Sequence, residues 1–396
     1  MAGLRAHFVT NVAGVARSEA DVRVIVVGAG IGGLAAGIAL RRAGSEVEMF
    51  ERAEVMQDVG AGLSLWANAI HALDRLGLGD RIRALSTPYA AAGLRTWDGR
   101  VLTAPPPDLE RRLGVLCVVV HRAELLEALL ETFEPAGLHL GARCERVQQD
   151  ECGVTAELSG GRHVRGDVLI GADGLHSVVR AQLHGDEPPR YAGYTAWRGV
   201  VAFDTGRVRA SESWGYGTRF GQVPMGGGRV YWFATENTSE GGRNPDEKAH
   251  LLRLFRGWHA PIEELIRATP GSEILRNDIH DRPTADRWGE GRLTLLGDAA
   301  HPMTPNLGQG ACQALEDAVV LARCLGQQPD PAMALRQYEA ERLPRTNTLV
   351  TLSRRVGTIG QFQQPLAVYL RNAAMSRISP RRQARQLERI VGYRVG

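Results

Sequence analysis

Lysine is almost absent from this chain: Lys248 is the only lysine among the 47 basic residues, and all the others are arginine. So strong a preference for arginine points to genomic base composition rather than to phosphate recognition, and the formal net charge is only +3. Charge therefore gives no reason to expect a nucleic-acid or membrane partner. Arginines do cluster near the C-terminus, at a spacing that predicts one solvated face of a terminal helix: Arg377, Arg381, Arg382, Arg385, Arg389 and Arg394.

Cysteine pairs and long apolar runs are also missing. The five cysteines are scattered, odd in number and never spaced as C-x-x-C. This pattern argues against a disulfide framework and against a structural metal, and it favours a reducing, cytoplasmic location. No apolar run approaches the length of a membrane span. Residues 1–20 hold no uninterrupted apolar core, so they predict an extension of the chain rather than a signal peptide.

Glycine is plentiful, with 47 residues, and three glycine-bearing loops each follow an apolar, strand-like run. The first follows a β-branched run over 22–27, which is typical of a buried parallel strand. Gly28, Gly30 and Gly33 then match the G-x-G-x-x-G pattern, in which they permit a tight turn, close approach of a pyrophosphate and helix–strand packing. The N-terminal amides of the helix predicted over 32–43 would face that diphosphate.

An acidic residue follows at the distance that this pattern requires. A second strand over 46–51 ends at Glu51, 18 residues after Gly33, where its carboxylate is placed to accept hydrogen bonds from a ribose diol. A 2′-phosphate would be repelled there, so we expect the site to bind the ADP half of FAD or NAD rather than NADP. The neighbouring Arg52 is a further candidate for contact with the cofactor.

The second loop, which contains Asp173, follows a strand expected over 167–170. The third begins at Asp298, after a strand expected over 292–296, and continues to a helix expected over 311–325. That helix is opened by a turn of three residues: Gly308, Gln309 and Gly310. Each loop alone is an ordinary strand-to-helix turn. In this order along one chain, they resemble the FAD-dependent aromatic hydroxylase family, the single-component flavoprotein monooxygenases, in its branch of salicylate, urate and zeaxanthin oxygenases.

This resemblance covers nearly the whole chain and implies FAD as a non-covalently bound cofactor. It implies that Asp298 bonds the ribityl chain, and that the turn over 308–310 offers backbone amides to the flavin pyrimidine edge. A helix N-terminus there suits the anionic reduced flavin. It also implies that the Asp173 loop contacts FAD and nicotinamide, and that Arg122 reaches the FAD phosphates or ribityl chain. Ser64 would hydrogen-bond the cofactor or simply lie at a strand end.

The family fold is α/β: a Rossmann-like FAD-binding lobe, interrupted by an antiparallel β-sheet substrate lobe and followed by a helical tail. For this chain it implies an extension over 1–20 and an FAD-binding domain over 21–185 and 283–345. The substrate domain would span 186–282, and the C-terminal helical segment 346–396. Length agrees with two lobes, since 396 residues are many for one domain.

The expected substrate lobe is rich in aromatic residues. Strands are expected over 194–203, in one or two pieces over 213–224, and over 229–235 after a hairpin turn. The aromatic side chains either pack the sheet or form the wall of an apolar pocket, and both hold if the two faces of a strand differ. Arg219 is the best candidate for a polar anchor near flavin and substrate, and Tyr231 is a second catalytic candidate. Either residue could equally be structural.

The sequence contains no second G-x-G-x-x-G motif, so nicotinamide would have to reduce the flavin from a transient position. In the family NAD(P)H reduces the flavin, O₂ adds at C4a, and the hydroperoxide hydroxylates or epoxidises an electron-rich aromatic or unsaturated small molecule. We expect this activity in a monomer or homodimer, with His301 bracing its loop rather than acting as a general base.

Two other activities remain to be weighed against this one. An FAD-dependent reductase or dehydrogenase of an apolar, isoprenoid-like substrate, without oxygen insertion, is the alternative that the motifs leave open. A halogenase has little support, because Lys248 lies in a polar stretch and no W-x-W-x-I-P motif occurs. The substrate itself, and the choice between NADH and NADPH, cannot be predicted from these motifs.

Overall fold

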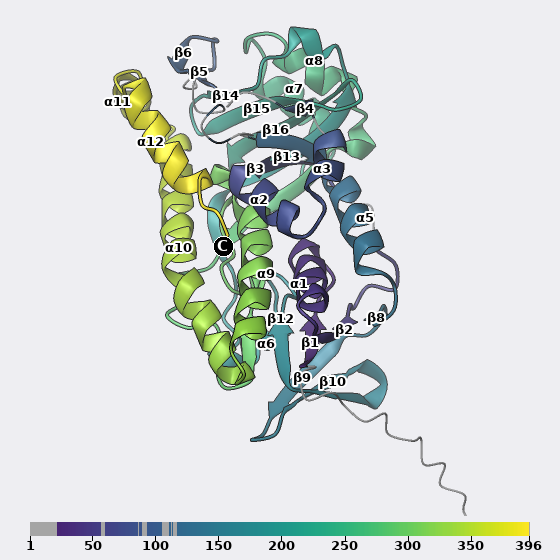
Figure 1. Cartoon of the computed structure of the whole chain (residues 1–396). Coiled ribbons are helices and arrows are strands. Elements are labelled where there is room, and N and C mark those ends of the chain that lie inside the picture. Colours follow the sequence, from purple (N-terminus) through teal and green to yellow (C-terminus); the bar gives the residue numbers. More distant parts are fainter. Residues whose placement is uncertain are drawn as a thin grey trace, which may run out of the picture.

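The computed structural model describes residues 22–56, 60–85, 87–88, 93–104 and 117–395, together with 111 and 113. The extension expected over 1–20 lies outside these residues. Figure 1 shows a parallel sheet in one half of the molecule, a larger sheet at the other end, and a long helix along one side.

The first sheet has five parallel strands in the order β18-β12-β1-β2-β8. Its strands are β1 Arg23–Val27, β2 Glu46–Phe50, β8 Leu138–His139, β12 Val168–Gly171 and β18 Leu293–Leu295. Apart from Arg23 at the start of β1, the side chains of β1 and β12 are almost inaccessible, as expected for central parallel strands covered on both faces. Helix α1 (Ile31–Arg42) packs on this sheet and against α5 (Arg122–Phe133) and α9 (Gly310–Gln327). The predicted Rossmann-like arrangement is confirmed.

Two small antiparallel sheets lie beside the parallel one. One contains β9 Cys144–Gln149, β10 Val154–Leu158 and β11 Arg162–Gly166, and the other β3 Gly62–Trp66, β4 Thr87–Pro88 and β7 Cys117–His121. Three helices accompany them: α2 Ala67–Arg75, α3 Gly79–Leu85 and α6 Val178–His184. Strands β3 and β7 contact β13 and β15 of the larger sheet, so this small sheet joins the two halves of the molecule.

The larger sheet has seven strands in the order β17-β13-β16-β15-β14-β5-β6. Its strands are β5 Gly93–Thr96, β6 Val101–Thr103, β13 Arg190–Ala202, β14 Ser211–Trp214, β15 Thr218–Met225, β16 Arg229–Asn237 and β17 Leu275–Asp281. The predicted antiparallel sheet is present in β13 to β17, and it is extended by β5 and β6, which come from outside 186–282, with β5 parallel to β14. Two strands of three and four residues carry too little alternation to be predicted from the sequence.

The two faces of this sheet carry different side chains, because successive residues of a strand point to opposite faces. Trp197, Phe220 and Trp232 lie on one face, in a buried cluster with α7 (Glu247–Leu254) and α8 (Ile262–Ala268). The residues next to them in sequence, including Arg219 and Tyr231, lie on the opposite face and line a cavity. Aromatic side chains therefore pack the sheet on one face and line a cavity on the other, and the role of that cavity as a substrate pocket stays a prediction.

The C-terminal part is helical, as predicted. It consists of α10 (Pro331–Gly360), α11 (Pro365–Met375) and α12 (Pro380–Val391), and α10 runs along one side of the molecule in Figure 1. The boundary expected at 345/346 falls inside α10, which continues unbroken through it. The division of the chain into domains thus stays a prediction. Within the described residues, no helix combines the length and apolar character needed to cross a bilayer.

Candidate functional site

A cavity of about 880 Å³ lies where the carboxyl ends of three parallel strands meet the large sheet. Gly30 follows β1, Gly174 follows β12 and Asp298 follows β18, and all three line it. Ligands of open α/β sheets bind outside the carboxyl ends of the strands, so this is the expected position for a cofactor. Across the cavity lie Arg219 and Tyr231 of the large sheet. Predicted residues from both lobes therefore line one space, although not all of the predicted residues do.

The glycines of the first loop have separate physical roles. Gly28 has φ of +102°, and a Cβ there would lie 2.5 Å from the Ala172 carbonyl oxygen, so the first loop packs against the second. A Cβ on Gly33 would lie 1.9 Å from the Gly28 carbonyl oxygen. A Cβ on Gly30 would meet nothing within 4 Å and would enter the cavity. The fold thus requires glycine at 28 and 33, whereas at 30 only a ligand would require it.

The start of α1 fits an anionic group. Gly30 is the N-cap, and its helix has no side chain that accepts hydrogen bonds from the first turn. Gly30, Ile31 and Gly32 all line the cavity. Backbone amides and the positive end of the helix dipole therefore face the open space, a donor set that suits the diphosphate of FAD.

Glu51 lies directly after β2 and ties two backbone segments together. Its Oε2 accepts a hydrogen bond from the Ala29 amide and its Oε1 from the Ala53 amide, each at 2.9 Å. A carboxylate has about four acceptor positions, so capacity remains for a ribose diol. The adjacent Arg52 is exposed. Contacts of Glu51 and Arg52 with the cofactor stay predictions.

Asp173 supports the second loop rather than lining the cavity itself. Its Oδ2 accepts hydrogen bonds from the amides of Val178 at 2.7 Å and Val179 at 3.4 Å, at the start of α6. Its Oδ1 is buried and has no partner among the described residues. Desolvation raises the pKa of this carboxyl. The neighbours on both sides, Ala172 and Gly174, line the cavity, so Asp173 fixes the shape of the wall that they form.

Asp298 lies in a short 3₁₀ turn, η4 (Gly297–Ala299), and its side chain is accessible from the cavity. Surrounding protein removes enough water to raise the pKa of its carboxyl, an effect that the charges of His301 and Arg122 oppose. Arg122 begins α5 and lines the same cavity, as does Ser64 in β3. The structure therefore brings these three predicted cofactor residues together, with opposite charges on Asp298 and Arg122.

The glycine turn before α9 faces the cavity through its backbone. Gly308 has a left-handed φ of +60°, and a Cβ there would lie 3.0 Å from the Trp66 Nε1. Gly308 and Gly310 line the cavity, and no side chain caps the first turn of α9. Gln309 differs, because its side chain is buried and its Oε1 accepts hydrogen bonds from Asn68 and Gln313 at 2.9 Å. Any contact of Gln309 with a cofactor would thus use its backbone.

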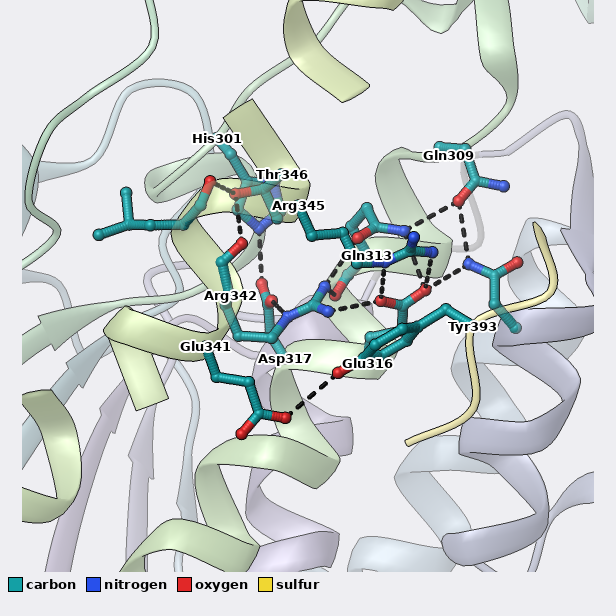
Figure 2. Close-up of polar contacts among 12 residues, drawn as sticks. His301, Gln309, Gln313, Glu316, Asp317, Glu341, Arg342, Arg345, Thr346 and Tyr393 are labelled. Atoms are coloured by element: carbon teal, nitrogen blue, oxygen red, sulfur yellow. Dashed lines mark hydrogen bonds and ion pairs between the residues drawn. The ribbon is translucent and has the colours of Figure 1, made fainter. Parts of the chain in front are cut away.

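A buried cluster of charges supports two loops on the expected flavin side of the cavity, the loop over 297–301 and the flavin-side turn over 308–310 (Figure 2). Arg342 donates to Asp317 Oδ1 at 2.7 Å and to Glu316 Oε2 at 2.5 Å, and Arg345 donates to Glu316 at 2.8 Å. Burial alone would raise the pKa of both carboxyls. The positive charge of Arg342, with Arg345 beside Glu316 and His301 beside Asp317, outweighs it and lowers them.

The cluster holds both loops in place. Asp317 Oδ2 accepts hydrogen bonds from the Gly297 amide at 3.1 Å and from His301 Nε2 at 2.6 Å. Glu316 Oε1 accepts from Asn68, which also donates to Gln309. His301 is buried and braces its loop, as predicted. Nothing in the sequence indicated the cluster, because Arg342 and Arg345 lie 25 or more residues from Glu316 and Asp317 and meet them only where α10 packs on α9.

Arg219 is only 2% exposed and is held by side chains from four other segments, one of which is Thr235 of β16. Its Nε donates to Gln361 Oε1 at 2.9 Å, its Nη1 to Glu212 Oε1 at 3.2 Å, and its Nη2 to Asn306 Oδ1 at 2.6 Å. Asn306 belongs to η5 (Pro305–Leu307), directly before Gly308. The guanidinium is therefore fixed relative to the flavin-side turn as well as to its own sheet.

Tyr231 lies on the same face, with its ring against β3. A Cβ on Gly62 would lie 2.2 Å from the Tyr231 Cγ, so glycine is needed there. Burial raises the pKa of the Tyr231 hydroxyl, and the neighbouring Arg198 opposes this. Arg198 and Asn306 also line the cavity but were not predicted. Alternation along β13 would have placed Arg198 on the cavity face, whereas nothing in the sequence singled out Asn306.

Known proteins resemble this chain over most of its length. The family model described as FAD binding domain matches residues 21–353. Aurachin C monooxygenase/isomerase of Stigmatella aurantiaca is 46% identical over 91% of this chain and 95% of that protein. The FAD-dependent urate hydroxylase of Klebsiella pneumoniae subsp. pneumoniae is 37% identical over 84% of this chain and 89% of that protein. The crystal structure of Klebsiella pneumoniae HpxO complexed with FAD and uric acid has a TM-score of 0.88 and 33% identity, covering 93% of this chain and 96% of that one.

These relatives support oxygen insertion rather than the reductase or dehydrogenase alternative. The cradle of glycines, the uncapped starts of α1 and α9, and Asp298 with Arg122 fit FAD. The family predicted from three loops is confirmed. The chain belongs to the FAD-dependent monooxygenases.

Proposed function

We propose that this monooxygenase oxygenates a planar aromatic or heteroaromatic small molecule bound against the large sheet. The observation that carries the proposal is the continuity of one cavity from the glycine turns to Arg219 and Tyr231. Cofactor and substrate would then share a single space, with no further domain between them. Among the relatives, the names urate hydroxylase and 3-amino-4-hydroxybenzoate 2-monooxygenase specify ring compounds.

FAD bound in this cavity supplies two-electron redox chemistry and O₂ activation, with NADH or NADPH as the reductant. The chain's own part in binding it begins with the first glycine loop and the start of α1, which hold the diphosphate. Glu51 accepts from the ribose, while Asp298, with Arg122 and Ser64 nearby, holds the ribityl side. The backbone amides of the turn over 308–310 would face the flavin ring, where a helix N-terminus stabilises negative charge.

The substrate end combines an apolar wall with a few polar groups. Tyr231, Phe233 and Leu275 supply apolar surface for a ring, and Arg198 and Arg219 supply positive charge. A ring hydroxyl or carboxylate facing Arg219 would be oriented by it. The same positive charge favours the ionised form of an acidic hydroxyl, which makes the ring more electron-rich.

Tyr231 acts as a hydrogen-bond donor in this proposal. Because burial raises its pKa above the ordinary value, its hydroxyl stays protonated at neutral pH. Arg219, with its donors already directed by Gln361, Glu212 and Asn306, needs little reorganisation when a substrate binds. Binding geometry and exclusion of water are therefore the tasks of these residues.

The test is substrate-dependent oxidation of NADH and NADPH by the purified holoenzyme. A panel of phenols, heteroaromatic rings and polyenes would be compared under isotopically labelled O₂, with O₂ uptake and product mass as readouts. We expect ring compounds to accelerate NAD(P)H oxidation and to gain one labelled oxygen atom. Epoxidation of polyenes with inert ring compounds would contradict the proposed substrate class. Turnover without labelled product would contradict the proposed oxygenation.

A further inference from the structure

Helix α11 presents an apolar face to solvent. Leu366 and Tyr369 are each 70% exposed and Leu370 is 57% exposed. Their spacing of i, i+3 and i+4 places them on one side of the helix. The opposite side carries Val368 and Arg371, which are buried. Helix α11 is thus held to the protein by one face while three large apolar side chains point away from it.

Helix α12, which follows directly, presents a cationic face. Arg381, Arg382, Arg385 and Arg389 are all exposed. At 3.6 residues per turn they fall within an arc of about 100°. Its opposite side is buried through Ala384, Ile390 and Val391. Residues 347–396 contain nine arginines and a single acidic residue, so little negative charge offsets this face.

Together, an apolar face and an adjacent cationic face are the features of a surface that docks on a bilayer. We propose that α11 and α12 form an interfacial docking surface for anionic lipid membranes. Leu366, Tyr369 and Leu370 would enter the boundary between headgroups and acyl chains, and the arginines of α12 would pair with anionic headgroups. Charge complementarity selects this occupant over a second copy of the chain, since a two-fold contact would bring the two arginine faces together.

Nucleic acid is a poorer match, because it would pair with the arginines and leave the three apolar side chains exposed. The docking surface also adjoins the cavity already described. Leu387, on the inner side of α12, lines that cavity and packs with Met303 and Leu307 beside the flavin-side turn. A membrane bound by α12 would therefore be separated from the cavity by the thickness of one helix, which suits a substrate that partitions into lipid.

Sedimentation of the full-length holoenzyme with vesicles tests the proposal without reference to any substrate. Vesicles of phosphatidylcholine alone would be compared with vesicles that also contain phosphatidylglycerol, at low and high salt. We expect binding to the anionic vesicles only, and weaker binding at high salt because ions screen the charges. Equal binding to both vesicle types, or no binding to either, would overturn the proposal.

Variants assign the binding to the two helices. Changing the four arginines of α12 to glutamine should lower partitioning about fivefold for each arginine, or several hundredfold together. Changing Leu366, Tyr369 and Leu370 to serine should lower it by at least about tenfold. The control for the serine variant is Val55→Ser, at a 68% exposed site on the FAD-binding lobe. The control for the α12 variant changes four exposed arginines of the substrate lobe to glutamine: Arg243, Arg253, Arg256 and Arg267.

The controls make every outcome decisive. Unchanged FAD content and circular dichroism will show that the variants are folded. If the control quadruple variant loses binding as strongly as the α12 variant, binding reflects overall charge and the assignment to α12 is wrong. A different result would be that the holoenzyme forms dimers, that the serine variant of α11 is monomeric, and that the holoenzyme does not bind vesicles. In that case a second copy of the chain occupies this face and the membrane proposal fails.

Discussion

The two walls of the cavity are built in different ways. The cofactor wall is mainly backbone: glycines without Cβ atoms at 28, 30 and 33, and two helix starts that no side chain caps. The substrate wall is mainly side chains, and its principal charged group, Arg219, is held by residues from β14, η5 and the end of α10. A cofactor of fixed structure can be bound largely by backbone groups. A substrate that differs among relatives requires side chains that can change.

The difference also affects what each wall tolerates. A Cβ on Gly33 has no room because the obstructing atom is backbone, which cannot move without disturbing β1 and α1. A new side chain on the substrate wall would instead meet other side chains, which can adopt new rotamers. We therefore expect substitutions in the cofactor wall and its support to lower the stability of the fold or the affinity for FAD. Substitutions in the substrate wall should instead lower the rate of productive turnover.

The largest expected effect concerns the support of the cofactor wall. Arg342→Met leaves Glu316 and Asp317 buried without the charge that pairs with both, which should lower the free energy of unfolding by about 3–5 kcal/mol. Arg287→Met is the control, because its ion pair with Glu290 is exposed and should contribute at most about 1 kcal/mol. Urea denaturation of both variants measures the difference. Equal losses would show that the cluster contributes no more than a surface pair.

The same pair of carboxyls predicts the response of stability to acid. Both have pKa values below the ordinary range in the folded protein, so their contribution is complete above about pH 4–5 and is lost as pH falls through the lower folded values. Without Arg342, less positive charge would offset the effect of burial, so both pKa values would rise. Arg342→Met should therefore lose further stability at a higher pH than the parent protein does.

The next effect separates two glycines of one loop. Gly33→Ala should lower the free energy of unfolding by about 3 kcal/mol or more, because its Cβ meets a backbone oxygen at 1.9 Å. Gly30→Ala should leave the protein without FAD as stable as its parent, since its Cβ has open space, yet weaken FAD binding. Denaturation without FAD and fluorescence titration with FAD distinguish the two. A Gly30→Ala protein with normal FAD affinity would show that the diphosphate lies elsewhere.

The sequence predicted the cofactor wall better than the substrate wall for a physical reason. Strands over 22–27 and 167–170 and the turn over 308–310 are contiguous segments whose chemistry depends on local backbone conformation. Arg219 and Tyr231 could be proposed from their place on the aromatic strands, but their partners could not. Gln361 lies 142 residues from Arg219 and Asn306 lies 87 residues away, so only folding brings them together.

The sequence was least informative where structure depends on packing between distant segments. The short strands β5 and β6 join the large sheet from residues 93–103, and Arg342 reaches Glu316 only because α10 packs on α9. Gln309 was expected to offer its backbone amide to the cofactor, which stays a prediction, while the direction of its side chain, into the buried cluster, was not predicted. A spacing pattern predicts where the backbone goes, but it does not say which way each side chain points.

Arg219→Ala tests the substrate wall directly. Without the guanidinium the substrate loses its anchor, and a misplacement of about 1 Å can lower the rate of the productive reaction on the order of a hundredfold. FAD content should stay near normal because Arg219 lies on the opposite wall. The readout is the ratio of H₂O₂ to oxygenated product per NAD(P)H consumed, which should rise. Unchanged coupling would assign Arg219 to the sheet's structure and make Tyr231 the next residue to test.

Asp298→Ala tests the opposite wall and should act on affinity rather than on coupling. Loss of one charge-assisted hydrogen bond costs about 1.5–3 kcal/mol, or roughly tenfold to 150-fold in the dissociation constant of FAD. Glu51→Ala should weaken binding similarly through the ribose, although it also frees the amides of Ala29 and Ala53. Fluorescence titration measures both constants. Unchanged constants in both variants would mean that these carboxylates do not contact the cofactor.

The smallest expected effect lies where the two walls meet. Asn306 accepts a hydrogen bond from Arg219 Nη2 at 2.6 Å and donates to the Ser353 carbonyl at 3.0 Å, so it fixes the anchor relative to the flavin-side turn. Asn306→Ala removes one of several bonds to Arg219, which should cost about 1 kcal/mol, or roughly fivefold in productive turnover. Asn347→Ala is the control, because it removes an amide hydrogen bond to the Ala285 carbonyl outside the cavity.

The ratio of peroxide to product distinguishes positioning from a general loss of stability, which would lower both together. If Asn306 acts through Arg219, the double variant Arg219→Ala/Asn306→Ala should be no less coupled than Arg219→Ala alone, because the anchor that Asn306 positions is already gone. Additive losses of coupling would instead show that Asn306 contacts the substrate or cofactor in its own right. In that case Asn306 and Arg219 act separately, and η5 contacts the substrate or cofactor directly rather than positioning Arg219.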